Sequence, residues 1–202
     1  MIVVKLGGSL AFSPLLRRWL LAIEAARGKV VVVPGGGPFA DAVRATQPAM
    51  GLNDKPAHDM ALLAMAQYGI ALASLSTRLV LADSRPGLEA ALWRGRIPVW
   101  SPWPMLCDAL DIPASWDVTS DSLALWLAHL LSVPRVLMVK RRCAPAGASA
   151  QQLAAAGLLD AAAPHFLGAY GGTLLVAGPE DVPEALDPDN PPGCRIALRE
   201  AA

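Results

Sequence analysis

The sequence predicts an α/β fold, a three-layer sandwich in which helices cover both faces of a mainly parallel central sheet. Short apolar runs recur along the chain and alternate with longer segments that place apolar residues at helical spacing. Two early runs also end in glycine clusters that lead directly into helical segments. This order of strand, glycine turn and helix is typical of parallel sheets. Because such sheets bind ligands at the carboxyl ends of their strands, both clusters would lie at a binding edge.

The individual elements follow from these patterns in chain order. A helix near the middle of the chain should begin at Thr119, Ser120 and Asp121, which are residue types that favour helix starts. A segment with four prolines, residues 183–192, should be a loop. The expected strands are residues 2–5, 29–33, 78–82, 97–100, 136–139, 173–177 and 195–198. The expected helices are residues 14–26, 39–46, 56–75, 88–93, 118–131 and 150–158.

The composition indicates one compact domain over residues 1–202. A chain of 202 residues that is 54% apolar can bury one substantial core but is short for two domains. Its 17 basic and 17 acidic residues give a net charge of zero, so no overall field attracts nucleic acid or an anionic membrane. We therefore expect neither as a partner.

The cysteines and the apolar segments indicate a protein of the reducing cytoplasm. Cys107, Cys143 and Cys194 lie far apart and lack CxxC spacing, which argues against a disulfide framework and a zinc site. The first apolar run is broken by Lys5 and is shorter than the core of a signal peptide. The apolar stretch at residues 60–75 is shorter than the roughly 20 residues of a membrane span.

The two glycine clusters are candidate anion sites. Gly7, Gly8 and Ser9 follow a strand and precede a helix, so their backbone N–H groups can face an anion. Lys5 adds a positive charge just before them. Taken alone, this cluster fits a simple tight turn equally well. The second cluster, residues 35–37, follows the next strand, so two amide-lined cradles would lie side by side, one for a donor phosphate and one for an acceptor.

These segments resemble those of a known family. No G-x-x-x-x-G-K-[ST] or G-x-G-x-x-G motif occurs in the chain. Nevertheless, KLGGS at residues 5–9, PGGG at residues 34–37 and a later aspartate at a helix start resemble the amino acid kinase family, which includes acetylglutamate, aspartate, uridylate and isopentenyl phosphate kinases. The resemblance implies phosphoryl transfer from ATP with Mg²⁺.

The resemblance also implies roles for particular residues. Lys5 would contact the transferring phosphoryl group, and Asp121 would orient lysine side chains. The nucleotide side would use Gly7, Gly8 and Ser9, and the acceptor side would use Gly35, Gly36 and Gly37.

Two further segments narrow the resemblance to one branch of the family. HDMALLAMAQYG at residues 58–69 and SWDVTSDSLALWLA at residues 115–128 are similar to the branch that phosphorylates an aminomethylfuran phosphate in methanofuran biosynthesis, and to its relatives in one-carbon-metabolising bacteria. This similarity implies a small phosphorylated acceptor and a homo-oligomer. It implies that His58, Thr119 and Ser120 lie at the acceptor site, with a subunit contact as the alternative for His58.

One departure from the family pattern concerns positive charge. Family members often carry a second catalytic lysine late in the chain, whereas Lys140 is the last lysine here. Lys140, helped by Arg141, would then supply the second charge and contact the nucleotide. Residues 1–140 would form the phosphoryl-transfer and acceptor half, and residues 141–202 a shortened nucleotide side. The alternatives are a non-catalytic nucleotide-binding or regulatory protein and a carboxylate or carbamate kinase.

Several candidates also have a purely structural interpretation. Asp121 is a common helix N-terminal residue, although with Asp117 it could also hold Mg²⁺ through water; we predict no direct protein ligands for a metal. His58 could be a buried structural histidine. Three residues at helical spacing are better explained as core residues, or as a helix-to-helix contact between subunits, than as a cofactor site. They are Met60, Met65 and Tyr68. Four tryptophans lie close together in the sequence and are better explained as core residues than as a surface on which a flat substrate ring stacks. They are Trp93, Trp100, Trp103 and Trp116.

Overall fold

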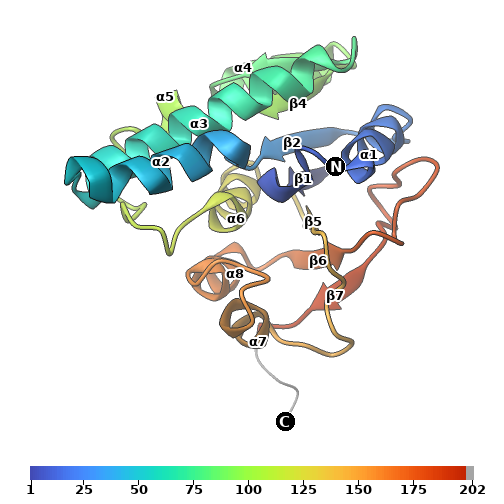
Figure 1. The fold of residues 1–202 in the computed structure, drawn as a ribbon. Helices are drawn as coiled ribbons and strands as arrows, with labels where there is room; N and C mark the ends of the chain where they lie inside the picture. Colours follow the sequence, from blue (N-terminus) through green and yellow to red (C-terminus); the bar gives the residue numbers. More distant parts are fainter. Residues whose placement is uncertain (199–202) are drawn as a thin grey trace.

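A computed structural model describes residues 1–198 and confirms the predicted fold class. Its central sheet has seven strands in the order β3-β4-β2-β1-β5-β6-β7, and all pairs are parallel except β6 with β7 (Figure 1). The strands are β1 Ile2–Leu6, β2 Val30–Pro34, β3 Leu79–Ala82, β4 Ile97–Trp100, β5 Arg135–Val139, β6 Thr173–Ala177 and β7 Cys194–Ile196.

The helices alternate with the strands through most of the chain. They are the 3₁₀-helix η1 Gly8–Leu10 and the α-helices α1 Pro14–Glu24, α2 Gly37–Met50, α3 Asp54–Ser74, α4 Arg85–Trp93, α5 Trp103–Leu106, α6 Ser120–Leu130, α7 Ala150–Ala155 and α8 Ala163–Tyr170. Among the residues that the structure describes, no helix is both long enough and apolar enough to cross a bilayer.

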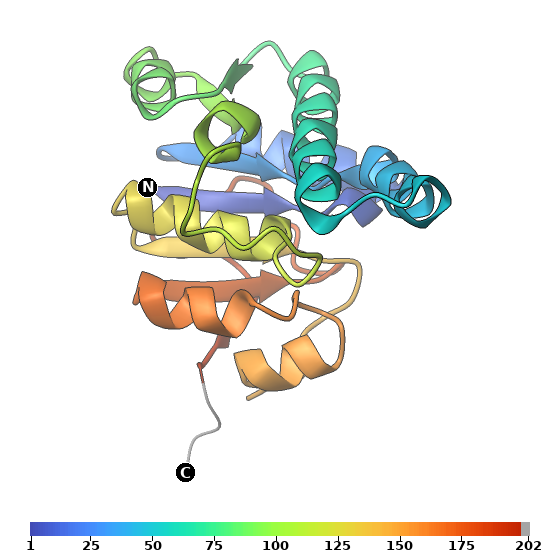
Figure 2. The same cartoon turned by 90° about the vertical axis from the view of Figure 1, so that its left-hand side faces the viewer.

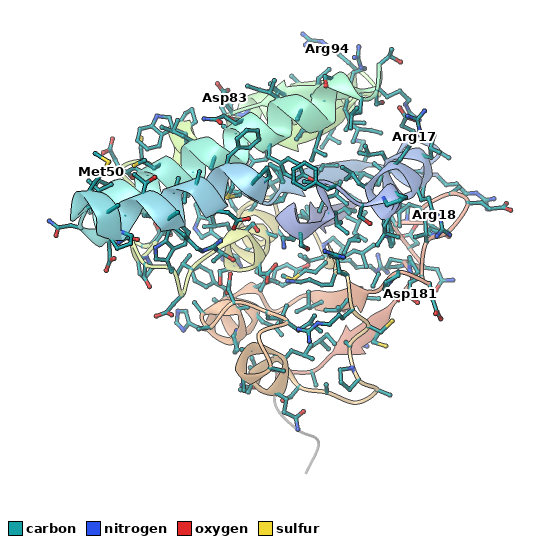
Figure 3. All side chains as sticks on the ribbon, in the orientation of Figure 1. Arg17, Arg18, Met50, Asp83, Arg94 and Asp181 are labelled. Carbon is teal, nitrogen blue, oxygen red and sulfur yellow. The ribbon has the colours of Figure 1, made fainter. Side chains whose placement is uncertain are left out.

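The alternation of side chains along β1 produces the three layers. Val4 packs on one face of the sheet in a cluster with Trp19 of α1, whereas Val3 packs on the other face in a cluster with Leu127 of α6. Figure 2 shows α6 (yellow) and α8 (orange) in front of the strands. On α1, the outward-facing Arg17 and Arg18 are exposed at the surface of the molecule (Figure 3), which explains its amphipathic pattern.

The same alternation determines which face of the sheet the Lys5 side chain lies on. Lys5 shares the α6 face with Val3, because side chains two positions apart on a strand point the same way. β1 lies between β2 and β5, and Lys5 is in register with Val33 and Met138. The segments that follow β1, β2 and β5 therefore meet at one edge of the sheet, at the point where the strand order reverses.

The structure differs from the sequence prediction in a few elements. Helices α5 and α8 were not predicted. Helix α2 was expected to end near residue 46, but it continues through Pro48 to Met50 and is followed by Gly51, whose φ of 64° suits a glycine helix end. Helix α7 is shorter than expected because Gly157 takes a φ of 65°. The expected last strand is the short antiparallel β7.

Candidate active site

A cavity of about 450 Å³ lies where the two glycine loops, the first turn of α6, the facing sides of α2 and α3, and the loop at residues 157–160 come together. Lys5, Asp121 and Lys140 line it together with the first glycine loop. His58 and Ser120 line it from α3 and α6. Most of the residues predicted for the donor and the acceptor therefore face one continuous space.

At the sheet edge, two lysines hold one aspartate between them. Lys5 Nζ lies 2.8 Å from Asp121 Oδ1, and Lys140 Nζ lies 2.6 Å from Asp121 Oδ2. Only 6% of the Lys5 side chain, 5% of the Asp121 side chain and 12% of the Lys140 side chain are exposed. The three groups carry one net positive charge next to the N-terminus of α6, whose backbone N–H groups add partial positive charge. This end of the cavity therefore suits an anion.

Different elements bring these three side chains together. Lys5 points to the α6 side of β1, and Asp121 is in the first turn of α6. Lys140 is the residue directly after β5, which pairs with β1. The second charge that the sequence analysis assigned to Lys140 therefore lies opposite Lys5, across the Asp121 carboxylate.

Burial and charge act in opposite directions on the pKa values of this cluster. Burial alone would raise the pKa of Asp121, but Lys5 and Lys140 together outweigh it and hold that pKa well below its usual range. Burial, with the neighbouring Lys5 charge, lowers the pKa of Lys140 to about 8, even though Asp121 and Asp160 oppose the shift. Lys140 can thus lose its proton at mildly alkaline pH.

Replacing Lys140 with methionine should lower kcat at least about tenfold, which is about 1.4 kcal/mol of transition-state stabilisation. Methionine keeps most of the aliphatic stem and removes the charge, so the loss reports electrostatics more than packing. The rate of the wild type should also fall as pH rises through about 8, because Lys140 is protonated below its pKa and neutral above it. Steady-state kinetics between pH 6 and 9.5 would check both effects. A variant that keeps the alkaline fall would show that another group causes it.

The glycines of the two loops serve mainly to let the loops touch. A Cβ on Gly8 would lie 2.3 Å from the backbone nitrogen of Gly37, and a Cβ on Gly35 would lie 2.3 Å from that of Gly8. Gly35 also donates its N–H to the Leu6 carbonyl at 2.8 Å and is not among the described residues that line the cavity. Gly7, Gly8, Gly36 and Gly37 do line it. The two loops therefore lie side by side, as expected, and pack into one unit, in which Gly35 contributes to the packing and not to the cavity lining.

This contact changes what substitutions in the loops should do. Gly8→Ala should destabilise the fold by about 3 kcal/mol or more, because the new methyl group meets backbone atoms that cannot rotate away. Gly95→Ala is the matched control: Gly95 has a φ of 67° and open space around its Cβ position, so it should cost only about 1 kcal/mol. Urea unfolding of the two variants would test this difference. Equal stabilities would contradict the contact between the loops.

Two further polar residues of the cavity have free hydrogen-bonding capacity. His58 and Ser120 are buried, line the cavity and make no side-chain hydrogen bond to another described residue. Burial lowers the pKa of His58; the Asp59 charge opposes this shift and the Lys55 charge adds to it, so the neutral form of His58 is favoured. Both groups can therefore bind a polar ligand. This geometry fits the acceptor-side prediction for His58 and Ser120.

Thr119 lies at the cavity but its donors are already used. Its backbone N–H and its hydroxyl both donate to Asp160 Oδ2, each at 2.8 Å. Only the lone pairs of the hydroxyl remain for a ligand. Thr119 therefore supports the start of α6 more directly than it can bind a substrate.

The tryptophans, predicted together as core residues, separate into different environments. Trp100 is fully buried, and Trp103 packs against the core. Trp93 is 85% exposed, so the core interpretation is wrong there. Trp116 lines the cavity, with the Arg44 guanidinium carbon 4.4 Å from its ring centroid.

The core prediction is confirmed for Met65 and Tyr68, which are buried, while Met60 packs against a small cluster between α2 and α3.

Arg44 and Asp160 are among the cavity residues that the sequence analysis missed. Arg44 lies on α2, where an exposed arginine on a helix carries no specific signal. Asp160 lies in the loop before α8, 39 residues after Asp121, and its backbone N–H donates to Asp121 Oδ2 at 3.2 Å. No local pattern in the sequence connects residues so far apart.

The carboxylates of Asp121 and Asp160 offer little to a metal ion directly. The described residues contain no group of three His, Cys, Asp or Glu side chains placed to bind a metal. Asp121 is paired with two lysines, and Asp160 accepts hydrogen bonds from Thr119 and Ser122. The suggested pair of Asp117 and Asp121 therefore does not present a free Asp121 carboxylate.

Comparison with known proteins shows which family the chain is similar to. The model of the family described as "Amino acid kinase family" matches residues 1–141. A curated relative, the [5-(aminomethyl)furan-3-yl]methyl phosphate kinase of Methanocaldococcus jannaschii, is 31% identical over 138 residues. The alignment covers 67% of this chain and 63% of the relative, so the matched part is less than two thirds of that protein.

Solved structures with low sequence identity share the fold. The uridylate kinase from Archaeoglobus fulgidus is 17% identical, with a TM-score of 0.71 over 97% of this chain and 99% of that one. The UMP kinase from Bacillus anthracis is 15% identical, with a TM-score of 0.66 over 100% and 97%. Because the family model covers well over half of the residues and the architecture agrees, this chain belongs to the amino acid kinase family.

Proposed function

We propose that this protein is a kinase that transfers the γ-phosphate of ATP to the phosphate group of a small acceptor, giving ADP and a diphosphate. The observation that carries this proposal is the buried pair of lysines around Asp121, at the end of a cavity lined by the glycine loops. Phosphoryl transfer needs alignment of the two reactants and neutralisation of charge more than it needs covalent chemistry from the protein. Lys5, Lys140 and the loop amides are the parts that such a reaction requires.

In the proposed reaction, an oxygen of the acceptor phosphate forms a bond to the γ-phosphorus of ATP. The bond from that phosphorus to the oxygen bridging the β- and γ-phosphates breaks, and ADP leaves with the electron pair. Lys5 and Lys140 stabilise the negative charge on the transferring group, while Asp121 holds both ammonium groups in place. A phosphate acceptor is already ionised, so the reaction needs no general base.

ATP would be held on its phosphates by Lys5, Lys140, Gly7, Gly8 and Ser9, all of which line the cavity. Mg²⁺ fits this site as an ion that arrives with the nucleotide, since magnesium is commonly held by substrate phosphates and water with few protein ligands. When bound, it would neutralise part of the phosphate charge. The protein side chains would align the reactants.

The acceptor we propose is a small phosphorylated ring compound with an amine, as in the name of the M. jannaschii relative. Trp116, Leu62 and Met65 give the cavity apolar surface for a flat ring. His58 and Ser120 offer hydrogen bonds, and Arg44 adds a positive charge beside Trp116. The carboxylates of Asp41 and Asp54, also on the cavity lining, offer partners for an amine.

Three further expectations stay predictions. They are a cytoplasmic location, the division into a transfer half at residues 1–140 and a nucleotide side at residues 141–202, and assembly into a homo-oligomer. The exposed apolar residues Leu63 and Ile70 on α3 fit a helix contact between subunits. Light scattering of the purified protein would test the last of these.

The assay that tests the proposal measures ADP release with a coupled enzyme system. ATP should yield ADP only when a phosphorylated acceptor is present, with [5-(aminomethyl)furan-3-yl]methyl phosphate the most active, and UMP and carbamate as competing candidates. A protein that is stabilised by ATP but releases no ADP with any acceptor would be a nucleotide-binding protein without turnover. Activity with carbamate alone would identify a carbamate kinase.

A further inference from the structure

The side chain of Asp160, in the loop before α8, forms hydrogen bonds with the start of α6. Its Oδ2 accepts hydrogen bonds from the backbone N–H and hydroxyl of Thr119, and from the backbone N–H of Ser122 at 3.0 Å. Its Oδ1 accepts the hydroxyl hydrogen of Ser122 at 2.5 Å. Asp160 thus satisfies N–H groups at the helix start that α6 itself cannot, because the first turn of a helix has no internal partners for them.

Asp160 also contacts the reactive centre through its backbone. Its N–H donates to the same oxygen of Asp121 that pairs with Lys140, at 3.2 Å. A second backbone hydrogen bond joins the two segments: the N–H of Ala162 donates to the carbonyl of Asp117 at 3.0 Å. The Asp121 carboxylate is therefore held from three directions, by two lysines and by this loop.

This loop is outside the region that the family model matches. The family model ends at residue 141, whereas Asp160 lies in the following segment and lines the cavity. Asp160 is half-buried, and a carboxylate that accepts four hydrogen bonds away from bulk water is costly to place unless its partners are well ordered. Here all four come from the helix start that carries Asp121.

We propose that Asp160 is a positioning residue of the phosphoryl-transfer centre, which acts through Asp121 and Lys140 and brings the C-terminal part of the chain into the active site. This inference rests on the proposed kinase function. The Asp160 side chain fixes the first turn of α6, its backbone fixes the Asp121 carboxylate, and its negative charge helps keep Lys140 protonated. The charged groups that act on Lys140 are Lys5, Asp121 and Asp160.

The charge of Asp160 and its hydrogen bonds can be separated by substitution. In Asp160→Asn, the amide oxygen can still accept from Thr119 and Ser122, and its NH₂ group can donate to the Ser122 hydroxyl, so the contacts survive and the charge is lost. Asp160→Ala removes both. Ser149→Ala is the control, because Ser149 accepts from the Gln152 N–H as the cap of α7 and makes no contact with Asp121.

Three measurements decide the proposal: melting temperature, the pH dependence of kcat/KM, and the titration of the Lys140 ammonium by NMR. The chain has only four lysines, and Lys140→Met assigns the signal. Asp160→Asn should melt close to the wild type, yet shift the alkaline fall in rate and the Lys140 titration to lower pH, because the negative charge of Asp160 raises the pKa of Lys140. Asp160→Ala should lose at least about tenfold in kcat, whereas Ser149→Ala should melt earlier and keep kcat.

Some results would overturn the proposal. An Asp160→Asn protein whose rate profile and Lys140 titration match the wild type would do so, as would an Asp160→Ala protein that melts earlier but keeps kcat, like the control. If Asp160→Ala does not fold, Asp160→Asn alone decides. If the wild type turns over no acceptor, the kinase proposal fails, while the NMR titration still tests the link between Asp160 and Lys140.

Discussion

Replacing Lys5 with methionine should lower kcat at least about 100-fold, the largest loss that we expect from any single side chain. Removing one group that stabilises charge in a transition state typically costs about 10²–10³ in rate. Lys5 is nearly fully buried, points into the cavity and lies 2.8 Å from Asp121, so no solvent ion or flexible side chain can easily replace its charge. Single-turnover measurement of ADP formation would give the loss directly.

The control for this prediction is Lys29→Met. Lys29 also flanks a strand of the sheet, but its ammonium is exposed over the ring of Trp93, 5.6 Å from the centroid. This control should keep the wild-type rate. Circular dichroism of both variants would show whether the fold is intact, and a folded Lys5→Met protein with the wild-type rate would rule out the proposed role of Lys5.

Asp121→Asn should cause the second large effect, because it damages stability and activity together. The substitution leaves two buried ammonium groups without their shared counter-charge, and breaking a buried ion pair from one side commonly costs about 3–5 kcal/mol. The lysines would also lose their fixed positions, so kcat should fall at least about tenfold in whatever folded protein remains. Urea unfolding and kinetics on the same preparation would measure the two losses.

The stability difference between the wild type and Asp121→Asn should depend on pH in one direction. The pKa of Asp121 is lowered in the folded state, so its contribution is fully present above its unfolded value of about 4 and is lost as the pH falls through the folded pKa. The two unfolding curves should therefore approach each other in acid. A gap that stays constant from pH 7 to pH 2 would contradict the ion-pair arrangement.

Much of the fold could be predicted because its strands carry strong local signals. The β-branched run of β1 and the glycines after it indicate a strand and a turn without any knowledge of the rest of the chain. Helix α8 could not be predicted in the same way, since its short alanine-rich sequence contains Pro164 and Gly168, which usually indicate a break. It forms because Phe166 and Leu167 pack into the core beside α6.

Local sequence patterns predicted the site only where it depends on one segment, and Lys140 was assigned through the family resemblance. Lys5 and Asp121 each stand in a recognisable local setting, a strand end and a helix start. The position of Lys140 beside Asp121 depends on β5 pairing with β1, which no local pattern specifies. Asp160 depends on the docking of a loop from the C-terminal part, and the close contact between Gly8 and Gly37 depends on β1 and β2 being neighbours.

The measurement that tests the central claim most directly is ³¹P NMR of the product formed from ATP, Mg²⁺ and [5-(aminomethyl)furan-3-yl]methyl phosphate. Transfer onto a phosphate group should replace the single acceptor resonance with two coupled resonances of a diphosphate, together with those of ADP, and Lys5→Met should leave the spectrum of the reactants unchanged. Release of inorganic phosphate with the acceptor resonance intact, or a spectrum in which ATP is not consumed by the wild type, would contradict the account.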